Sequence, residues 1–220
     1  MLRLYDNMTS GNGYKVRLLL TLLGLPFERV ELDIDRGETR TPAFLAKNAN
    51  GRIPLLELAP GDRIAESNAI LCYLAEGTPY LPDARRARAA VLEWLFFEQY
   101  SHEPNIATPR YWITHKLVTA ERAQQLPEKR RLGHAALVVM ERHLAGHPYF
   151  VGETPTVADI ALYAYTHVAP EGGFDLAPYE AVRGWIARIP AIPGYIPITA
   201  RVGREVAKDV AAAGAARGSR

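Results

Sequence analysis

The sequence predicts an α+β domain followed by an all-helical domain, and two changes of pattern along the chain carry this prediction. Up to about residue 76, short strand patterns and helical patterns alternate in the order βαβ-α-ββα. Beyond residue 86 the apolar residues recur at helical spacing. Residues 77–86 (GTPYLPDARR) carry the composition of a linker. We therefore place the domains at residues 1–78 and 87–200, with a flexible tail at 201–220.

The bulk composition is that of an ordinary globular protein. The chain is 48% hydrophobic and 23% charged, and its net charge of +2 comes from scattered basic residues, so nothing requires nucleic acid. No run of 18 apolar residues predicts a membrane span. The single cysteine, Cys72, excludes an internal disulfide and is expected to be a buried apolar residue. A reducing cytoplasm is the expected location.

A strand, a helix and a second strand open the first domain. Residues 1–6 alternate as a strand, residues 7–13 have the composition of a loop, and a helix runs from Tyr14 to a C-terminal Gly24. Residues 27–34 place their apolar side chains on one face of a second strand. Because such crossovers are right-handed, we expect the two strands to be parallel.

The rest of the first domain is a short helix, two strands and a helix. Thr41-Pro42 opens the short helix, and two strands joined by Pro60-Gly61-Asp62 follow. Pro54 stands at the mouth of the first of these strands, where a residue without an N–H is tolerated. Ser67 precedes an apolar-periodic run and is predicted to be a helix N-cap. A strand edge opened by proline beside a helix start is a plausible peptide-binding corner.

The second domain is predicted to be a bundle of helices. One helix has a capping box at its start, Thr156-Val157-Ala158-Asp159, in which Asp replaces the usual Glu or Gln. The segment Ser101–Asn105 breaks the first helix of the bundle, and the chain then continues that helix or starts another. The predicted helices cover residues 87–100, 106–114, 127–144, 156–165 and 179–189.

This layout and four motifs resemble the cytosolic glutathione transferases over about residues 1–200. The motifs are Arg52-Ile53-Pro54, Glu66-Ser67, the capping box, and the loop Ser10-Gly11-Asn12-Gly13-Tyr14-Lys15-Val16. Each motif alone is weak, but the order and spacing are specific. The resemblance implies a thioredoxin-like first domain, glutathione as co-substrate, and a homodimer.

The resemblance also assigns residues that bind glutathione. It implies that Pro54 is cis, that the backbone of Ile53 binds the cysteinyl part, and that Glu66 and Ser67 hold the γ-glutamyl group. These residue types are suitable, because a carboxylate accepts from an ammonium group and a helix start donates to a carboxylate. Taken alone, Glu66 and Ser67 would also fit a plain N-cap beside a favourable charge. Arg52 and Arg40 are the candidates for the glycyl carboxylate.

The predicted chemistry is ionisation of the glutathione thiol. Lowering a thiol pKa of about 8.5 by two units requires roughly 2.7 kcal/mol. A hydrogen bond to a charged group contributes roughly 1.5–3 kcal/mol and a helix N-terminus about 0.3–2 kcal/mol. One donor before the first helix therefore suffices, without a general base.

The donor is expected in the loop before the first helix. That loop is similar to the Thr-Pro-Asn-Gly-His-Lys-Ile loop of the bacterial nu-class and yeast prion-related transferases, so Ser10 matches the Thr and Asn12 the Asn. Gly13 stands where many theta-like relatives carry Ser or Cys, which excludes a single-serine mechanism at that position. We predict Ser10 first and Asn12 second, with backbone N–H groups assisting. Thr9 and Tyr5 stay open as alternatives, although Tyr5 is expected to pack in the sheet.

The electrophilic substrate that accepts the glutathione thiolate is expected to lie against the second domain. In relatives the region after residue 100 faces the active site, so the candidate pocket residues are His102, Asn105, Arg110, Tyr111 and Trp112, for each of which ordinary packing is an equal alternative. His143 and His147 stand at i and i+4 but lack a third ligand, so no metal is expected.

The sequence therefore predicts a glutathione transferase whose thiolate attacks a small electrophile. One alternative is a glutathione-dependent disulfide or peroxide reductase, which needs no protein cysteine. A second alternative is a non-enzymatic binding or regulatory protein of the same fold. Both site motifs of the first domain are retained, which argues against the second alternative. The expected partners are glutathione, a small electrophilic or disulfide substrate and a second copy of the chain, with no nucleic acid and no membrane.

Overall fold

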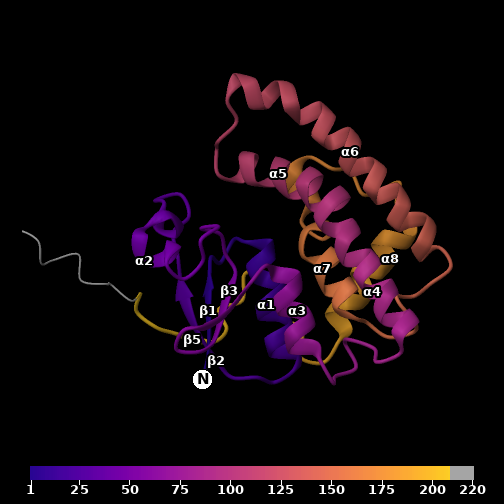
Figure 1. Ribbon diagram of the computed structural model, residues 1–220. Helices are drawn as coiled ribbons and strands as arrows, with labels where there is room; N and C mark the ends of the chain where they lie inside the picture. Colours follow the sequence, from indigo (N-terminus) through magenta and orange to yellow (C-terminus); the bar gives the residue numbers. More distant parts are fainter. Residues whose placement is uncertain (209–220) are drawn as a thin grey trace, which may run out of the picture.

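A five-stranded sheet forms the centre of the first domain in the computed structural model, which describes residues 1–208 (Figure 1). The strand order is β4-β3-β1-β2-β5. As predicted, β1 and β2 are parallel, whereas β3 is antiparallel to both β1 and β4. The strands are β1 (Leu2–Asp6), β2 (Phe27–Glu31), β3 (Leu55–Ala59), β4 (Asp62–Ala65) and β5 (Arg204–Glu205).

Helices α1 (Gly11–Leu22) and α3 (Ser67–Ala75) pack together beside this sheet, and α2 (Pro42–Leu45) is short. Helix α1 starts three residues before the predicted Tyr14, because Ser10 caps it by accepting the Gly13 N–H. The prediction that Ser67 is an N-cap was wrong. Glu66 holds that position with a φ of 69°, and Ser67 is the first helical residue.

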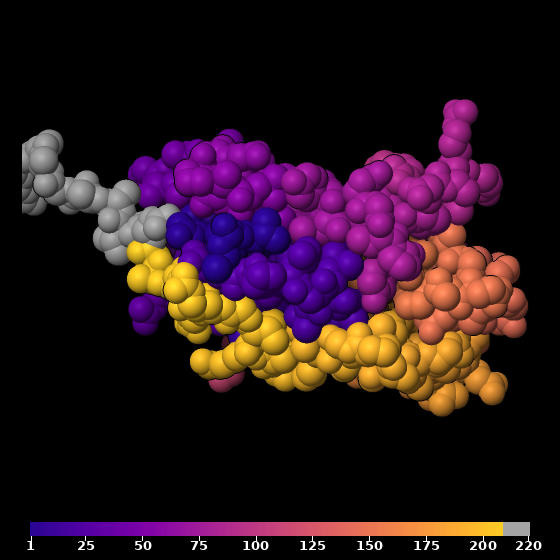
Figure 2. All heavy atoms as spheres, turned by 90° about the horizontal axis from the view of Figure 1, so that it is seen from below, coloured from indigo at the N-terminus to yellow at the C-terminus, as the bar shows by residue number. Residues whose placement is uncertain are grey.

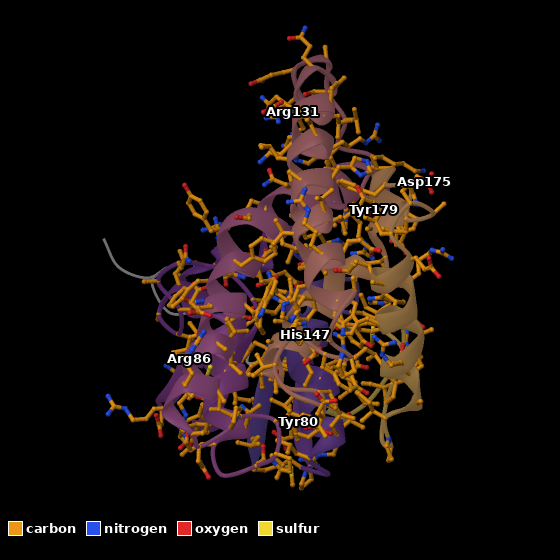
Figure 3. All side chains as sticks on the ribbon, turned by 90° about the vertical axis from the view of Figure 1, so that its right-hand side faces the viewer. Tyr80, Arg86, Arg131, His147, Asp175 and Tyr179 are labelled. Atoms are coloured by element: carbon orange, nitrogen blue, oxygen red, sulfur yellow. The ribbon has the colours of Figure 1, made fainter. Side chains whose placement is uncertain are left out.

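The second domain is helical, as predicted, and its first two helices are continuous. A π-helical segment, Glu98–His102, joins α4 (Arg85–Phe97) to α5 (Glu103–Thr114), so the expected break at residues 101–105 is a widened turn. Helix α6 (Ala120–Leu144) starts seven residues before the predicted Pro127, because Thr119 caps it and the proline is accommodated inside it. Figure 3 shows α6 projecting beyond the bundle, with Arg131 toward that end.

Helix α7 (Val157–Thr166) lies at the core of the second domain and is entirely buried. Its predicted capping box is confirmed. The Asp159 carboxylate accepts the N–H groups of Thr156 at 2.8 Å and Phe150 at 3.1 Å, and the indole N–H of Trp185 at 2.9 Å. The remaining helices are α8 (Glu180–Arg188) and the 3₁₀ turns η1 (Glu38–Arg40), η3 (Ala169–Gly172) and η4 (Ile189–Ala191).

The chain returns to the first domain after the bundle, which corrects part of the predicted tail. Figure 2 shows this segment lying along the first domain. Residues 204–205 form β5, pair in parallel with β2, and bring Arg204 onto Glu28 in an ion pair. Residues 209–220 of the predicted tail lie outside the described residues. Within residues 1–208 no helix is long and apolar enough to cross a bilayer.

Candidate functional site

A cavity of about 480 Å³ lies between the two domains. This volume is in the range of small-molecule sites. The first domain contributes residues around the start of α1, the segment before α2 and the segment before β3, and the second contributes one side of α5 and Tyr165 of α7. The predicted site residues that line it are Ser10, Arg40, Arg52, Ile53, Arg110, Tyr111 and Trp112.

One wall of the cavity is the segment that precedes β3. The peptide bond between Ile53 and Pro54 is cis, as the resemblance implied. The paired register of β3 begins at Leu55, so Ile53 lies outside the ladder while it lines the cavity. A residue that precedes its strand and stays outside the ladder is a suitable partner for the backbone of a ligand peptide.

Glu66 and Ser67 lie beside this wall, outside the lining of the cavity. Glu66 is exposed, and its carboxylate accepts from the Asn50 side-chain amide at 3.5 Å. Ser67 is buried, and its hydroxyl donates to Asn12 Oδ1 at 3.2 Å and accepts from Lys15 Nζ at 3.4 Å. The Ser67 hydroxyl is therefore engaged within the protein, and its backbone N–H at the start of α3 is the group placed to bind a carboxylate.

Ser10 is both a helix cap and a potential donor. Its hydroxyl oxygen accepts the Gly13 N–H at 3.2 Å, and the residue lines the cavity. A hydroxyl that accepts a hydrogen bond keeps its own proton, which leaves Ser10 able to donate to a ligand.

Asn12 is held by both domains. Its side-chain amide donates to Glu103 Oε1 at 2.9 Å, its side-chain oxygen accepts from Ser67, and its backbone N–H donates to the Tyr165 hydroxyl at 3.1 Å. Asn12 does not line the cavity. Because one of its two amide protons is donated to Glu103, its predicted role as second donor depends on the other proton.

Tyr5 and Thr9 are less suitable donors than Ser10. Tyr5 is buried in the sheet, donates to Glu57 at 3.2 Å and packs edge-on against Phe44. Thr9 lines the cavity, but its hydroxyl donates to Asn7 Oδ1 at 2.6 Å.

A buried ion pair lies beneath the loop and joins the domains. Lys15 Nζ and Glu98 Oε1 are 2.8 Å apart, and both side chains are fully buried. Glu98 also accepts from the side-chain amides of Asn68 at 3.1 Å and Gln99 at 2.8 Å. We call Asn12, Lys15, Ser67, Glu98 and Glu103 the interdomain polar cluster. Lys15 stands in a largely apolar helical pattern, the one sequence signal that could have indicated this cluster.

Gly13 has a steric reason to be glycine. A Cβ atom at this position would lie 1.5 Å from Asp6 Oδ1, so any side chain here must displace the Asp6 carboxylate. Asp6 forms a fully buried ion pair with Arg17, and burial raises the pKa of Asp6 to about 6 although Arg17 opposes the shift. Arg17 also donates to the carbonyls of Met8 and Ile198 at 3.0 Å, so it fixes the loop that leads to Ser10.

Two of the residues predicted for the pocket of the electrophilic substrate do not line the cavity. His102 is fully buried, its Nε2 lies 2.8 Å from Thr166 Oγ1, and burial lowers its pKa to about 3. Asn105 donates to the Ser101 carbonyl at 2.8 Å. The π-helical segment turns His102 into the bundle, which the sequence pattern did not indicate.

The other residues predicted for this pocket, Arg110, Tyr111 and Trp112, lie on the cavity side of α5. Arg110 donates to the Thr9 carbonyl at 3.0 Å and to Glu171 at 2.7 Å, so it also bridges the domains. Among the lining residues that the sequence interpretation missed, three carry titratable side chains, and their neighbours in the site are distant in sequence: Glu103, His115 and Tyr165.

The described residues show no metal centre. Within residues 1–208, no group of three His, Cys, Asp or Glu side chains is placed to hold a metal ion. The rings of His143 and His147 stack with centroids 4.3 Å apart, and His147 is labelled in Figure 3.

Comparison with known families matches both domains. Residues 1–76 match the family model of the glutathione S-transferase N-terminal domain, and residues 123–188 match that of the C-terminal domain. The chain belongs to the glutathione S-transferase family. The resemblance stated from the sequence is thereby confirmed, together with the thioredoxin-like first domain and the helical second domain.

Two curated relatives carry different activities in their names. The chain is 33% identical to the disulfide-bond oxidoreductase YfcG of Escherichia coli, over 93% of this chain and 98% of that protein. It is 34% identical to glutathione S-transferase 3 of Zea mays, over 88% and 91% of the two chains.

Solved structures of family members have the same fold. A glutathione S-transferase from Pseudomonas fluorescens is 50% identical and superimposes with a TM-score of 0.88, over 90% of this chain and 98% of the other. Ure2p in complex with glutathione is 25% identical, with a TM-score of 0.79, over 88% and 95% of the two chains.

Proposed function

We propose that this chain is a glutathione transferase that ionises the glutathione thiol at the start of α1 and directs it at a small electrophile. One observation carries the proposal. A single cavity joins Ile53 at the mouth of β3, the capped helix start at Ser10 and two arginines of the first domain, Arg40 and Arg52. These are the groups that a thiol tripeptide with carboxylates at both ends requires.

The binding groups suit the three parts of glutathione. The backbone of Ile53 would pair with the cysteinyl residue, as one strand pairs with another. The exposed Glu66 carboxylate would accept from the α-ammonium group, and the N–H of Ser67 would donate to the γ-glutamyl carboxylate. Arg52 is the better candidate for the glycyl carboxylate, because Arg40 already donates to the Asn50 carbonyl at 2.9 Å.

Thiol ionisation would come from Ser10 and the helix start. The Ser10 proton donates to the thiolate while the hydroxyl oxygen still accepts from Gly13, so capping and catalysis use different atoms of the same group. This hydrogen bond and the N-terminal end of α1 together supply roughly 2–5 kcal/mol, against roughly 2.7 kcal/mol needed for a two-unit fall in pKa. The nucleophile belongs to the co-substrate, and the protein supplies orientation and electrostatics.

A second candidate function is reduction of a disulfide by glutathione. The cavity carries Arg40 and Arg52 besides Arg110, which pairs with Glu171, so the arginine that does not bind glutathione suits an acceptor with negative charge. The name of the Escherichia coli relative supports this candidate. In this reaction the glutathione thiolate attacks one sulfur, the S–S bond breaks, and the other sulfur leaves as a thiolate. No protein thiol takes part: Cys72, the one cysteine of the chain, is partly buried on α3, and this burial raises the pKa of its thiol.

Two assays decide between these functions. Conjugation of glutathione to 1-chloro-2,4-dinitrobenzene should proceed, and Arg52→Ala should raise the KM for glutathione about tenfold because a charge-assisted contact is lost. Arg131→Ala on the exposed face of α6 is the control. If reduction of hydroxyethyl disulfide proceeds while conjugation is negligible, the second function replaces the first. If glutathione does not bind in titration calorimetry, both fail and a non-enzymatic role takes their place.

We also propose a homodimer, as the family implies. Large apolar side chains are exposed on α3, at the end of α4 and on the π-helical segment: Tyr73 at 52%, Phe96 at 71% and Tyr100 at 88%. Exposed apolar groups of this size are typical of an interaction surface. Light scattering coupled to size-exclusion chromatography should give twice the mass of the chain.

A further inference from the structure

A polar bridge crosses between the domains at the border of the cavity. The Tyr111 hydroxyl donates to Asp35 Oδ1 at 3.2 Å, and His115 Nε2 lies 3.8 Å from Asp35 Oδ2. Asp35 belongs to the segment between β2 and η1, whereas Tyr111 and His115 stand at the end of α5. We call these three residues the Asp35 latch.

Both sides of the latch border the cavity. Tyr111 and His115 line it directly, and Ile34, the neighbour of Asp35, lines it from the first domain. In Figure 1 the chain leaving α5 approaches the part of the first domain that carries α2. The other bridge from α5, between Arg110 and the Thr9 carbonyl, lies beside the start of α1. Helix α5 is therefore tied to two separate segments of the first domain, the residues before α1 and the segment after β2.

Each half of the latch is ordered without the other. Asp33 Oδ1 accepts the N–H groups of Asp35 and Arg36, both at 3.0 Å, and this turn fixes the position of Asp35. On α5 the rings of Tyr111 and His115 lie 4.3 Å apart, and His115 Nδ1 is 3.1 Å from the Tyr111 carbonyl. Breaking the latch therefore leaves both of its sides folded.

The contacts across the latch are also weak enough to open. The Asp35 side chain is 54% exposed, and polar contacts this accessible contribute little to stability. A half-exposed contact at the end of a helix belongs to the part of a structure that opens most readily. Such contacts are used where an enzyme admits and releases ligands.

We infer that the Asp35 latch determines how long a group the cavity accepts on the sulfur of glutathione. The inference rests on the proposed binding of glutathione. A short substituent fits within the closed cavity, whereas a long one must displace Tyr111 or His115 from Asp35 and lose those contacts. The latch therefore discriminates against long acceptors and their conjugates without touching the reacting atoms. Tyr111 and His115 act as specificity-determining residues, and Asp35 as the positioning residue that holds them.

Calorimetry with two product analogues tests the inference. S-methylglutathione and S-hexylglutathione share the tripeptide and differ in the length of the sulfur substituent. In Asp35→Ala, which removes both contacts, the Kd for the hexyl analogue divided by that for the methyl analogue should fall about two- to tenfold. Tyr111→Phe removes one hydroxyl and keeps the ring, so it should shift the same ratio in the same direction by a smaller factor.

The control is Asp62→Ala, the same change at an exposed aspartate on β4, which should leave the ratio unchanged. A ratio that stays constant or rises in both latch variants overturns the inference while the proposed function stands. If the native protein binds neither analogue, the proposed function fails, and the inference fails with it. Thermal unfolding of each variant shows whether it is folded, and Tyr111→Phe provides the test should Asp35→Ala not fold.

Discussion

The two segments that form the candidate site are built in different ways. The segment around Ile53 and Glu66 belongs to the first domain alone and presents backbone groups and one exposed carboxylate. The segment Ser10–Gly13, which is the N-cap and first turn of α1, lies between the domains, and we call it the activating loop. Asn12 in this loop bonds to Glu103 and Tyr165 of the second domain, and Lys15, one turn later, pairs with Glu98.

This difference separates binding from activation. The binding segment needs only the sheet and α3, so it should hold glutathione wherever the first domain is folded. The activating loop needs the second domain in place, because its partners come from the π-helical segment, α5 and α7. Substitutions in the interdomain polar cluster should therefore impair stability and thiol ionisation together, whereas substitutions at the binding segment should change affinity alone.

The largest expected effect comes from breaking the buried ion pair. Lys15→Met leaves the Glu98 carboxylate buried and unpaired, which should lower the free energy of unfolding by about 3–5 kcal/mol. Urea-induced unfolding measures this change. The double variant Lys15→Met/Glu98→Gln removes both charges and should recover more than half of the loss.

The matched control is an ion pair of similar length on the sheet. Arg63 Nε lies 2.9 Å from Glu57, but the Arg63 side chain is 24% exposed. Arg63→Met should therefore cost less than about 1 kcal/mol. Equal losses in the free energy of unfolding from Lys15→Met and Arg63→Met would contradict the distinction between the buried interdomain ion pair and the partly exposed ion pair on the sheet.

The next effect comes from the glycine inside the activating loop. In Gly13→Ala the new Cβ atom must displace the Asp6 carboxylate, which Arg17 holds in the core. Overpacking of this kind costs about 3 kcal/mol, which corresponds to a fall in Tm of about 6–12 °C for a chain of this size.

Gly146→Ala provides the comparison for this substitution. A Cβ atom at Gly146 would meet no atom within 4 Å, and the φ of this residue is not in the left-handed region, so the Tm should change by no more than about 2 °C. A Gly13→Ala protein as stable as Gly146→Ala would mean that Asp6 moves aside freely, and the steric account of Gly13 would be wrong.

The sequence predicts best what depends on neighbouring residues. The order of strands and helices, the capping box at Thr156, and the short motifs Ile53-Pro54 and Glu66-Ser67 all depend on residues within a few positions of each other. Where local signals conflict, the predicted boundaries are displaced. The pattern predicts a helix start at Pro127, whereas Thr119 provides the cap and the helix runs through the proline.

The rest of the site depends on contacts that no local pattern encodes. Asn12 and Tyr165 are 153 residues apart, and Lys15 and Glu98 are 83 apart. The resemblance to relatives places His102 at the pocket, but the π-helical segment turns it into the bundle. Strand β5 is two residues long and pairs with a strand about 176 positions earlier, so its pattern could not be distinguished from a tail.

The smallest expected effect is the most informative about chemistry, because it separates the two functions of Ser10. Ser10→Ala removes the cap of α1 and the proposed donor together. It should cost about 1 kcal/mol of stability and raise the pKa of the bound glutathione thiol by about one to two units. Absorbance of the thiolate as a function of pH measures this pKa.

Thr119→Ala isolates the capping effect. It removes the side-chain cap of α6, and Thr119 does not line the cavity, so the substitution should lower the free energy of unfolding by a similar amount and leave the thiol pKa unchanged. Asn12→Ala should raise the thiol pKa less than Ser10→Ala, since Asn12 does not line the cavity and shares its amide with Glu103. If Ser10→Ala behaves like Thr119→Ala, the hydroxyl is a cap alone, and the backbone at the start of α1 ionises the thiol without it. The activating loop would then act through its backbone, as the segment at Ile53 is proposed to do.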